Sequence, residues 1–148
     1  MHRLMLDTNI LMDATDRRRA KHNQALEVLR RCNGSGDKGF AASLSMKDCY
    51  YINGKIYDEA FARKAVRWLA DLLIIAPVSG EECLTSLYSN EPDFEDGLIR
   101  ACAELNDVDF IITNDEKAYS NSKVRALDAE AYLRIVASEE AAARELLR

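Results

Sequence analysis

The stretch Arg3–Asn9, with the sequence RLMLDTN, decides the fold, because it sets three apolar residues directly against a carboxylate, a hydroxyl and an amide. The apolar run from Leu4 to Leu6 is typical of a strand that is buried on both faces. Such strands belong to parallel sheets covered by helices, and open sheets of this kind bind ligands just beyond the carboxyl ends of their strands. The stretch therefore predicts that Asp7 lies at a ligand-binding edge.

Length and composition predict one domain over residues 1–148, since 148 residues with 48% hydrophobic residues suffice for one core. The formal net charge of −5 argues against binding nucleic acid by bulk positive charge, although a local patch or a bound metal leaves such binding open. No segment approaches the roughly 20 apolar residues of a membrane span. The four cysteines form no C-x-x-C pair and no secretion signal is visible, which favours the cytoplasm.

The order of apolar patterns predicts strands and helices in alternation. Further strands are expected over 39–43, 73–76, 108–113 and 124–127, and helices over 10–13, 20–32, 45–57, 58–73, 79–89, 93–105 and from 128 onward. Residues 33–36 (NGSG) would end the second helix, and Ser45 with Asp48 resembles a cap that opens the third. The alternation is typical of an α/β domain with a central parallel sheet.

Four carboxylates stand where this architecture would bring them together. Asp7 and Asp115 end predicted strands, while Asp48 and Asp96 stand in the first turns of predicted helices. Carboxylates crowded at one edge repel each other unless a divalent cation neutralises them. Because only two histidines are present, carboxylate ligands and hence Mg²⁺ or Mn²⁺ are expected. Two such ions, roughly 3.5–4 Å apart, would activate a phosphodiester for hydrolysis.

Some of the acidic residues also have a purely structural interpretation. Asp48 and Asp93 occupy cap positions, and Asp96 would form a surface ion pair with Arg100 on the same helix face. The apolar side of that helix is expected to be buried through Phe94, Leu98, Cys102 and Leu105. A basic run would either contact RNA phosphates or form a solvated helix start; it comprises Arg17, Arg18, Arg19 and Lys21.

The chain resembles PIN-domain proteins, in particular the VapC-like toxin ribonucleases, over roughly residues 3–136. The resemblance rests on the order and spacing of four segments: Leu6–Asn9, Ser45–Asp48, Asp93–Asp96 and Ile111–Asp115. It implies a three-layer α/β/α fold with a central parallel sheet, and metal-dependent endonucleolytic cleavage of RNA. The implied catalytic ligands of Mg²⁺ or Mn²⁺ are Asp7, Asp48, Asp96 and Asp115. In one departure, Asp48 stands where the family commonly has Glu.

The resemblance also implies supporting residues and partners. Hydroxyl and amide groups beside the acids would orient them, and the expected residues are Thr8, Asn9, Thr113 and Asn114. The carboxylate of Asp93 is expected to support the site as well and is favoured over that of Glu95. The implied partners are an RNA substrate, a cognate antitoxin protein and a second copy in a homodimer.

Two other functions stay open at this point. One is a catalytically silent PIN-like module that binds nucleic acid, which the shorter Asp48 side chain keeps in play. The other is a metal-dependent phosphatase or DNA nuclease on a similar scaffold. The haloacid-dehalogenase type of phosphatase is disfavoured, since its motif needs an Asp where this chain has Asn9.

Overall fold

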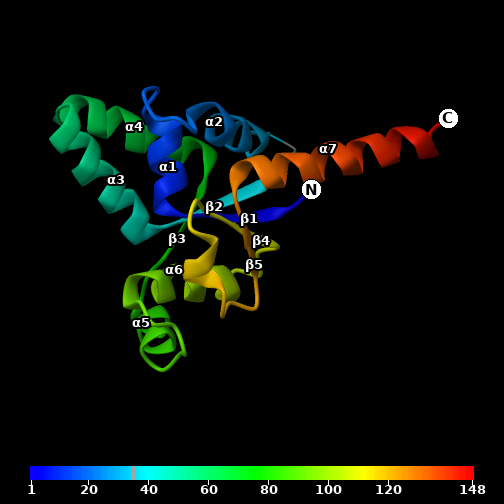
Figure 1. Cartoon of the computed structure of the whole chain (residues 1–148). Coiled ribbons are helices and arrows are strands. Elements are labelled where there is room, and N and C mark those ends of the chain that lie inside the picture. The colour runs from blue at the N-terminus through cyan, green and yellow to red at the C-terminus, as the bar shows by residue number, and fades with distance from the viewer. Residues whose placement is uncertain (35) are drawn as a thin grey trace.

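A five-stranded parallel sheet forms the centre of the molecule in the computed structural model, which describes residues 1–34 and 36–148 (Figure 1). The strands lie in the order β3-β2-β1-β4-β5 and are all parallel. Their bounds are β1 Arg3–Leu6, β2 Lys38–Ala42, β3 Ile74–Ala76, β4 Phe110–Ile112 and β5 Arg125–Leu127. Strands β2 and β3 are added on one side of β1, and β4 and β5 are added on its other side. A topological switch point therefore lies between β1 and β4, and open sheets bind ligands at such points.

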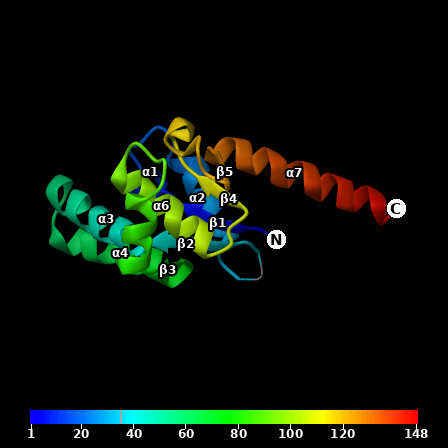
Figure 2. The same ribbon diagram turned by 90° about the horizontal axis from the view of Figure 1, so that it is seen from below.

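Helices cover both faces of the sheet (Figures 1 and 2). Their bounds are α1 Thr8–Thr15, α2 His22–Arg31, α3 Ser43–Ile56, α4 Glu59–Leu72, α5 Gly80–Leu87, α6 Phe94–Leu105 and α7 Ala129–Leu146, with a short 3₁₀ helix η1 at Glu116–Tyr119. Of the described helices, none is long and apolar enough to cross a membrane. The alternating elements thus form the three-layer α/β/α arrangement that the sequence predicts.

Strand β1 contributes side chains to two separate hydrophobic cores, because alternate side chains of a strand point to opposite faces of the sheet. Leu4 and Leu6 pack with residues of α1, α2, α4 and α7, whereas Met5 packs with residues of α6 and η1. All three side chains are fully buried. The prediction of a strand buried on both faces is confirmed.

Two helices begin earlier than predicted. Helix α1 starts at Thr8 instead of Ile10, because the Asp7 carboxylate caps it by accepting the backbone N–H of Thr8 at 2.7 Å. Helix α3 starts at Ser43, so the predicted cap at Ser45 is wrong. Ser45 is buried instead and accepts a hydrogen bond from the Thr8 hydroxyl at 2.8 Å. As a result, Asp48 lies in the second turn of α3 and not in the first.

The buried side of α6 and the end of α2 differ in part from the predictions. In α6, Leu98 and Cys102 are buried as predicted, but Phe94 and Leu105 are 45% and 44% exposed, because they are the first and last residues of the helix. The predicted helix terminator at 33–36 includes residue 35, which lies outside the described residues. Helix α2 ends at Arg31, and Gly34 follows with a φ of 87°, a conformation that suits glycine.

Candidate metal centre

The four predicted carboxylates line one cavity at the carboxyl edge of the sheet. Asp7 follows β1, Asp115 follows β4, and Asp48 and Asp96 come from the N-terminal halves of α3 and α6. The cavity has a volume of about 400 Å³ and is lined by Asp7, Thr8, Asn9, Met12, Arg19, Leu44, Asp48, Ile52, Glu95, Asp96, Ile99 and Asp115. The parallel sheet and the helices that begin at its edge therefore bring together acids that are up to 108 residues apart, from Asp7 to Asp115.

Asp7 is held rigidly at the bottom of this arrangement. Its side chain is largely buried, with the residue 8% exposed. One carboxylate oxygen accepts the backbone N–H of Thr8, and the other accepts the Thr113 hydroxyl at 2.8 Å, with the Asn9 amide at 3.4 Å. These donors compensate the desolvation of a buried charge and fix the direction in which the carboxylate points.

Thr113 links Asp7 to Asp115. Its fully buried hydroxyl donates to Asp7 and accepts the backbone N–H of Asp115 at 3.0 Å. The Asp115 side chain in turn caps η1 through the backbone N–H of Ala118. A single hydroxyl thus sets the relative position of the two strand-end acids across the switch point.

Asp96 lies in the first turn of α6, and its environment is strongly acidic. Burial raises the pKa of Asp96 to about 6, and the negative charges of Asp93, Asp7, Glu91 and Asp115 add to the increase. The ion pair with Arg100, which was the structural alternative for Asp96, does not form. Arg100 points to Glu104 and Asn90 instead, with contacts of 3.0 and 2.9 Å. Asp96 therefore has no positive neighbour from its own helix face.

Asp115 is the most exposed of the four acids, and Asp48 is partly exposed. The Asp48 side chain is 34% exposed, and the Lys47 ammonium lies 3.1 Å from one of its oxygens. The Asp48 side chain is one methylene shorter than a Glu at this position would be, but it retains the negative charge.

The expected supporting residues divide into two groups. Thr8, Asn9 and Thr113 contact Asp7 or line the cavity. Asp93 caps α6 by accepting the backbone N–H of Asp96 at 3.0 Å and is not among the cavity-lining residues, whereas Glu95 is. Asn114 directs its side-chain amide away from the cavity, to the buried Asp13 at 2.7 Å.

The basic run reaches the cavity through one residue. Arg19 lines the cavity while its guanidinium pairs with Asp13 at 2.6 Å. Arg18 pairs with Asp16 and lies over the ring of Tyr57, and Lys21 lies 3.5 Å from the Asn114 side-chain oxygen. Arg17 is exposed. The run is thus partly anchored by acids and partly available at the surface beside the cavity.

Three residues near the site were not predicted from the sequence. Asp13 anchors both Arg19 and Asn114, Glu91 is a buried carboxylate 3.7 Å from Arg100, and Tyr119 is a buried tyrosine at the end of η1. No local pattern distinguishes them, because their roles depend on contacts between segments far apart in sequence.

The residues present suit a hard divalent cation. Among residues 1–34 and 36–148, no group of three or more His, Cys, Asp or Glu side chains is arranged as a ready-made ion site. Even so, five carboxylates line the cavity, namely the four predicted acids and Glu95, and the pKa of Asp96 is raised by burial and by the neighbouring negative charges. All-oxygen donors of this kind prefer Mg²⁺ or Mn²⁺.

The chain matches the model of one known protein family. The family model described as PIN domain matches residues 3–117, which is more than half of the chain. This protein belongs to the PIN-domain family. A search of curated proteins finds no match in sequence.

Solved structures with similar folds come from bacterial toxin–antitoxin systems. VapC20 of Mycobacterium tuberculosis, described as a toxin that cleaves the sarcin–ricin loop, superposes with a TM-score of 0.65 at 13% identity, covering 82% of this chain and 98% of that one. A toxin–antitoxin complex from Klebsiella pneumoniae gives 0.64 at 20% identity, covering 85% and 97%. VapBC2 of Rickettsia felis, bound to a DNA fragment from its promoter, gives 0.62 at 17%, covering 85% and 98%. At these identities the likeness concerns the fold, which is VapC-like.

Proposed function

We propose that this chain is a divalent-metal-dependent endoribonuclease and the toxin component of a toxin–antitoxin pair. The observation that carries the proposal is the convergence of Asp7, Asp48, Asp96 and Asp115 on one cavity at the switch point of a PIN-domain sheet. The similar fold of a toxin that cleaves the sarcin–ricin loop supports RNA as the substrate.

In this proposal, Asp7, Asp96 and Asp115 would hold Mg²⁺ or Mn²⁺, and Asp48 would be a ligand or would hold a water molecule. When bound, such an ion supplies Lewis-acid polarisation of a phosphodiester and activation of water. The protein's own contribution is to position the acids, chiefly through the Thr113 hydroxyl.

Positive charge beside the acids would receive the RNA backbone. Arg19 is the arginine that lines the cavity, and its fork of N–H donors suits a phosphate. Arg17, Arg18 and Lys21 lie on the same loop and would extend the contact along the strand. Asp13 and Asp16 hold Arg19 and Arg18 in place, so these two contacts would be preorganised.

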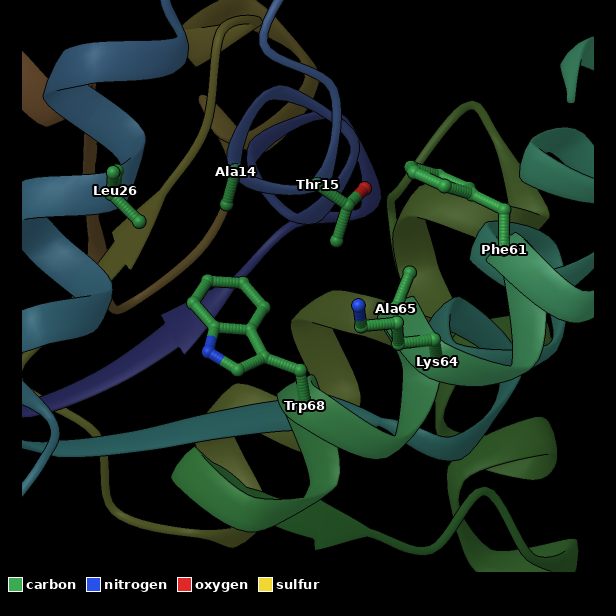
Figure 3. A pocket seen from close by; sticks show the side chains of 7 residues that line it. All are labelled: Ala14, Thr15, Leu26, Phe61, Lys64, Ala65 and Trp68. Atoms are coloured by element: carbon green, nitrogen blue, oxygen red, sulfur yellow. The ribbon is translucent and has the colours of Figure 1, made fainter.

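An apolar groove provides a place for the antitoxin. It has a volume of about 290 Å³ and lies between α1, α2 and α4 (Figure 3). Its lining is Ala14, Thr15, Leu26, Phe61, Lys64, Ala65 and Trp68. We assign it to an apolar antitoxin segment, because similar folds occur in solved toxin–antitoxin complexes. Lys64 at its rim would favour an acidic residue in that segment.

A homodimer stays a prediction, as does a cytoplasmic location. Exposed Leu84, Leu87 and Tyr88 on and beside α5 form an apolar surface that a second copy would bury. Light scattering coupled to size-exclusion chromatography measures the assembly directly.

The test is cleavage of a mixed pool of structured RNAs by the purified chain, free of antitoxin, with Mg²⁺, Mn²⁺ or EDTA. We expect metal-dependent cutting that Asp7→Asn and Asp96→Asn abolish. Asp71→Asn, which changes an exposed carboxylate of α4, is the matched control and should cut like the wild type. Induced expression in a bacterial host should arrest growth, and Asp7→Asn should relieve that arrest.

The same experiment separates the alternatives. Binding of RNA and metal without cleavage by any preparation would favour the silent binding module. Metal-dependent hydrolysis of single-stranded DNA or of p-nitrophenyl phosphate, with RNA left intact, would favour the DNA nuclease or the phosphatase.

A further inference from the structure

Tyr119 lies behind the acidic cavity and has no role in the proposed chemistry so far. It is the last residue of η1, the short helix that Asp115 caps. Its side chain is 2% exposed and packs in the core between the sheet and α6, together with Met5, Ile99 and Ile111. The ring thus occupies the space between the strand that leads to Asp7 and the helix that presents Asp96.

The Tyr119 hydroxyl is buried without a hydrogen-bond partner among the described residues. An unpaired buried hydroxyl is unfavourable, so a Phe would be the expected residue for simple packing. Burial raises the pKa of this hydroxyl, and so do the negative charges of Asp7, Asp96 and Glu91. The group is therefore a protonated donor surrounded by carboxylates.

Asp7 is a better acceptor for this hydroxyl than Glu91 is. Glu91 already has the Arg100 guanidinium 3.7 Å away, which offsets its charge. The Asp7 oxygens accept from Thr8 and Thr113, and a carboxylate has capacity for about four hydrogen bonds or metal contacts. A third donor and a cation can therefore be accommodated together.

We propose that Tyr119 is a positioning residue whose hydroxyl donates to the Asp7 carboxylate and keeps it directed into the cavity. Thr8 and Thr113 hold this carboxylate from the helix and from the neighbouring strand, and Tyr119 would hold it from the α6 side. The inference rests on the proposed function, because it treats Asp7 as a cation ligand.

The experiment compares two tyrosine-to-phenylalanine variants in the full chain. Tyr119→Phe removes only the hydroxyl. Tyr132→Phe removes the buried hydroxyl that donates to Asp37 at 2.6 Å, at the opposite edge of the sheet. Each protein is stripped with EDTA and dialysed, Mn²⁺ binding is measured by calorimetry, and thermal unfolding is followed without metal.

We expect Tyr119→Phe to weaken Mn²⁺ binding by roughly tenfold, as is typical when a residue that orients a ligand is lost. Tyr132→Phe should lower the melting temperature and leave Mn²⁺ binding unchanged. Wild-type affinity in Tyr119→Phe, beside a wild type that binds Mn²⁺ and an Asp7→Asn variant that does not, would overturn this inference alone. A wild type that binds no Mn²⁺ would overturn both the inference and the proposed metal site.

Discussion

At the scale of single residues, Asp7 shows how one side chain serves both folding and chemistry. Its carboxylate caps α1, which starts the helix at the edge of the sheet, and the same group lines the acidic cavity. Thr113 has a comparable double role, since its hydroxyl joins Asp7 to the backbone of Asp115. Loss of either residue should therefore affect the site and the local fold together.

Thr113→Val keeps the shape of the side chain and removes the hydroxyl. We expect RNA cleavage to fall about 10–100-fold, because Asp7 loses a donor. The free energy of unfolding should fall by about 1–3 kcal/mol, because the partly buried N–H of Asp115 loses its acceptor. Thr15→Val is the matched control: it removes a hydroxyl that accepts from Asn53, away from the cavity, and should reduce stability only. Equal cleavage by both variants would refute the role of Thr113.

Asp48 offers a graded test of the outer edge of the site. Asp48→Asn should reduce RNA cleavage by about tenfold, less than Asp7→Asn, because this carboxylate is partly exposed and already paired with Lys47. Asp48→Glu should retain cleavage, since it preserves the charge and extends its reach. Rates are measured at saturating Mg²⁺. Full activity of Asp48→Asn would exclude this residue from the metal site.

The residues that sequence reasoning identified are those with a local signature. Asp7, Asp96 and Asp115 stand beside recognisable element ends, and the structure places all three on one cavity. Asp93 was favoured over Glu95, and in the structure Asp93 caps α6 while Glu95 lines the cavity. A shared helix face does not reveal which of the two side chains serves as the cap. Tyr119 was missed because its neighbours come from other segments, and only the folded chain brings them together.

At the scale of elements, one buried carboxylate joins three segments at the amino ends of the strands, which lie opposite the cavity. Asp37, just before β2, accepts from the Arg31 guanidinium of α2 at 3.0 Å, the Tyr132 hydroxyl of α7 and the backbone N–H of His2. Burial alone would raise the pKa of Asp37, but the hydrogen bonds from Tyr132, His2 and Arg31 outweigh it and lower the pKa below its ordinary value.

This lowered pKa predicts acid sensitivity. A carboxyl whose folded pKa lies below its unfolded value of about 4 stabilises the fold above that pH, and the contribution is lost as the pH falls through the folded pKa. Asp37→Asn should reduce the free energy of unfolding by about 2–4 kcal/mol at pH 7. The difference from the wild type should shrink below about pH 4. Urea denaturation at several pH values measures it, and a difference independent of pH would contradict the assignment.

Element boundaries show the limit of local patterns. A capping box of Ser79 and Glu82 opens α5, and Asp128 caps α7, close to the helix starts at 79 and 128 that the sequence predicts. The Ser45 cap failed because α3 follows β2 without an intervening loop, so Ser45 is buried against Thr8 and does not stand at a helix start. Local propensity does not reveal that a helix has been extended by packing.

At the scale of the whole molecule, the fold class followed from the order of elements. Alternating strands and helices require crossovers, and crossovers produce parallel strands with helices on both faces. Strand order is a different matter, since no local pattern in the sequence states that β1 lies between β2 and β4. That order creates the switch point, and the switch point brings Asp7 beside Thr113 and Asp115.

Anomalous diffraction from crystals soaked in Mn²⁺ tests most directly whether Asp7, Asp96 and Asp115 hold one cation together. We predict a manganese peak within coordination distance of Asp7, Asp96 and Asp115, and its absence from crystals of the Asp7→Asn variant. A manganese peak only at other carboxylates, or none in a crystal whose cavity is open to solvent, would contradict the account.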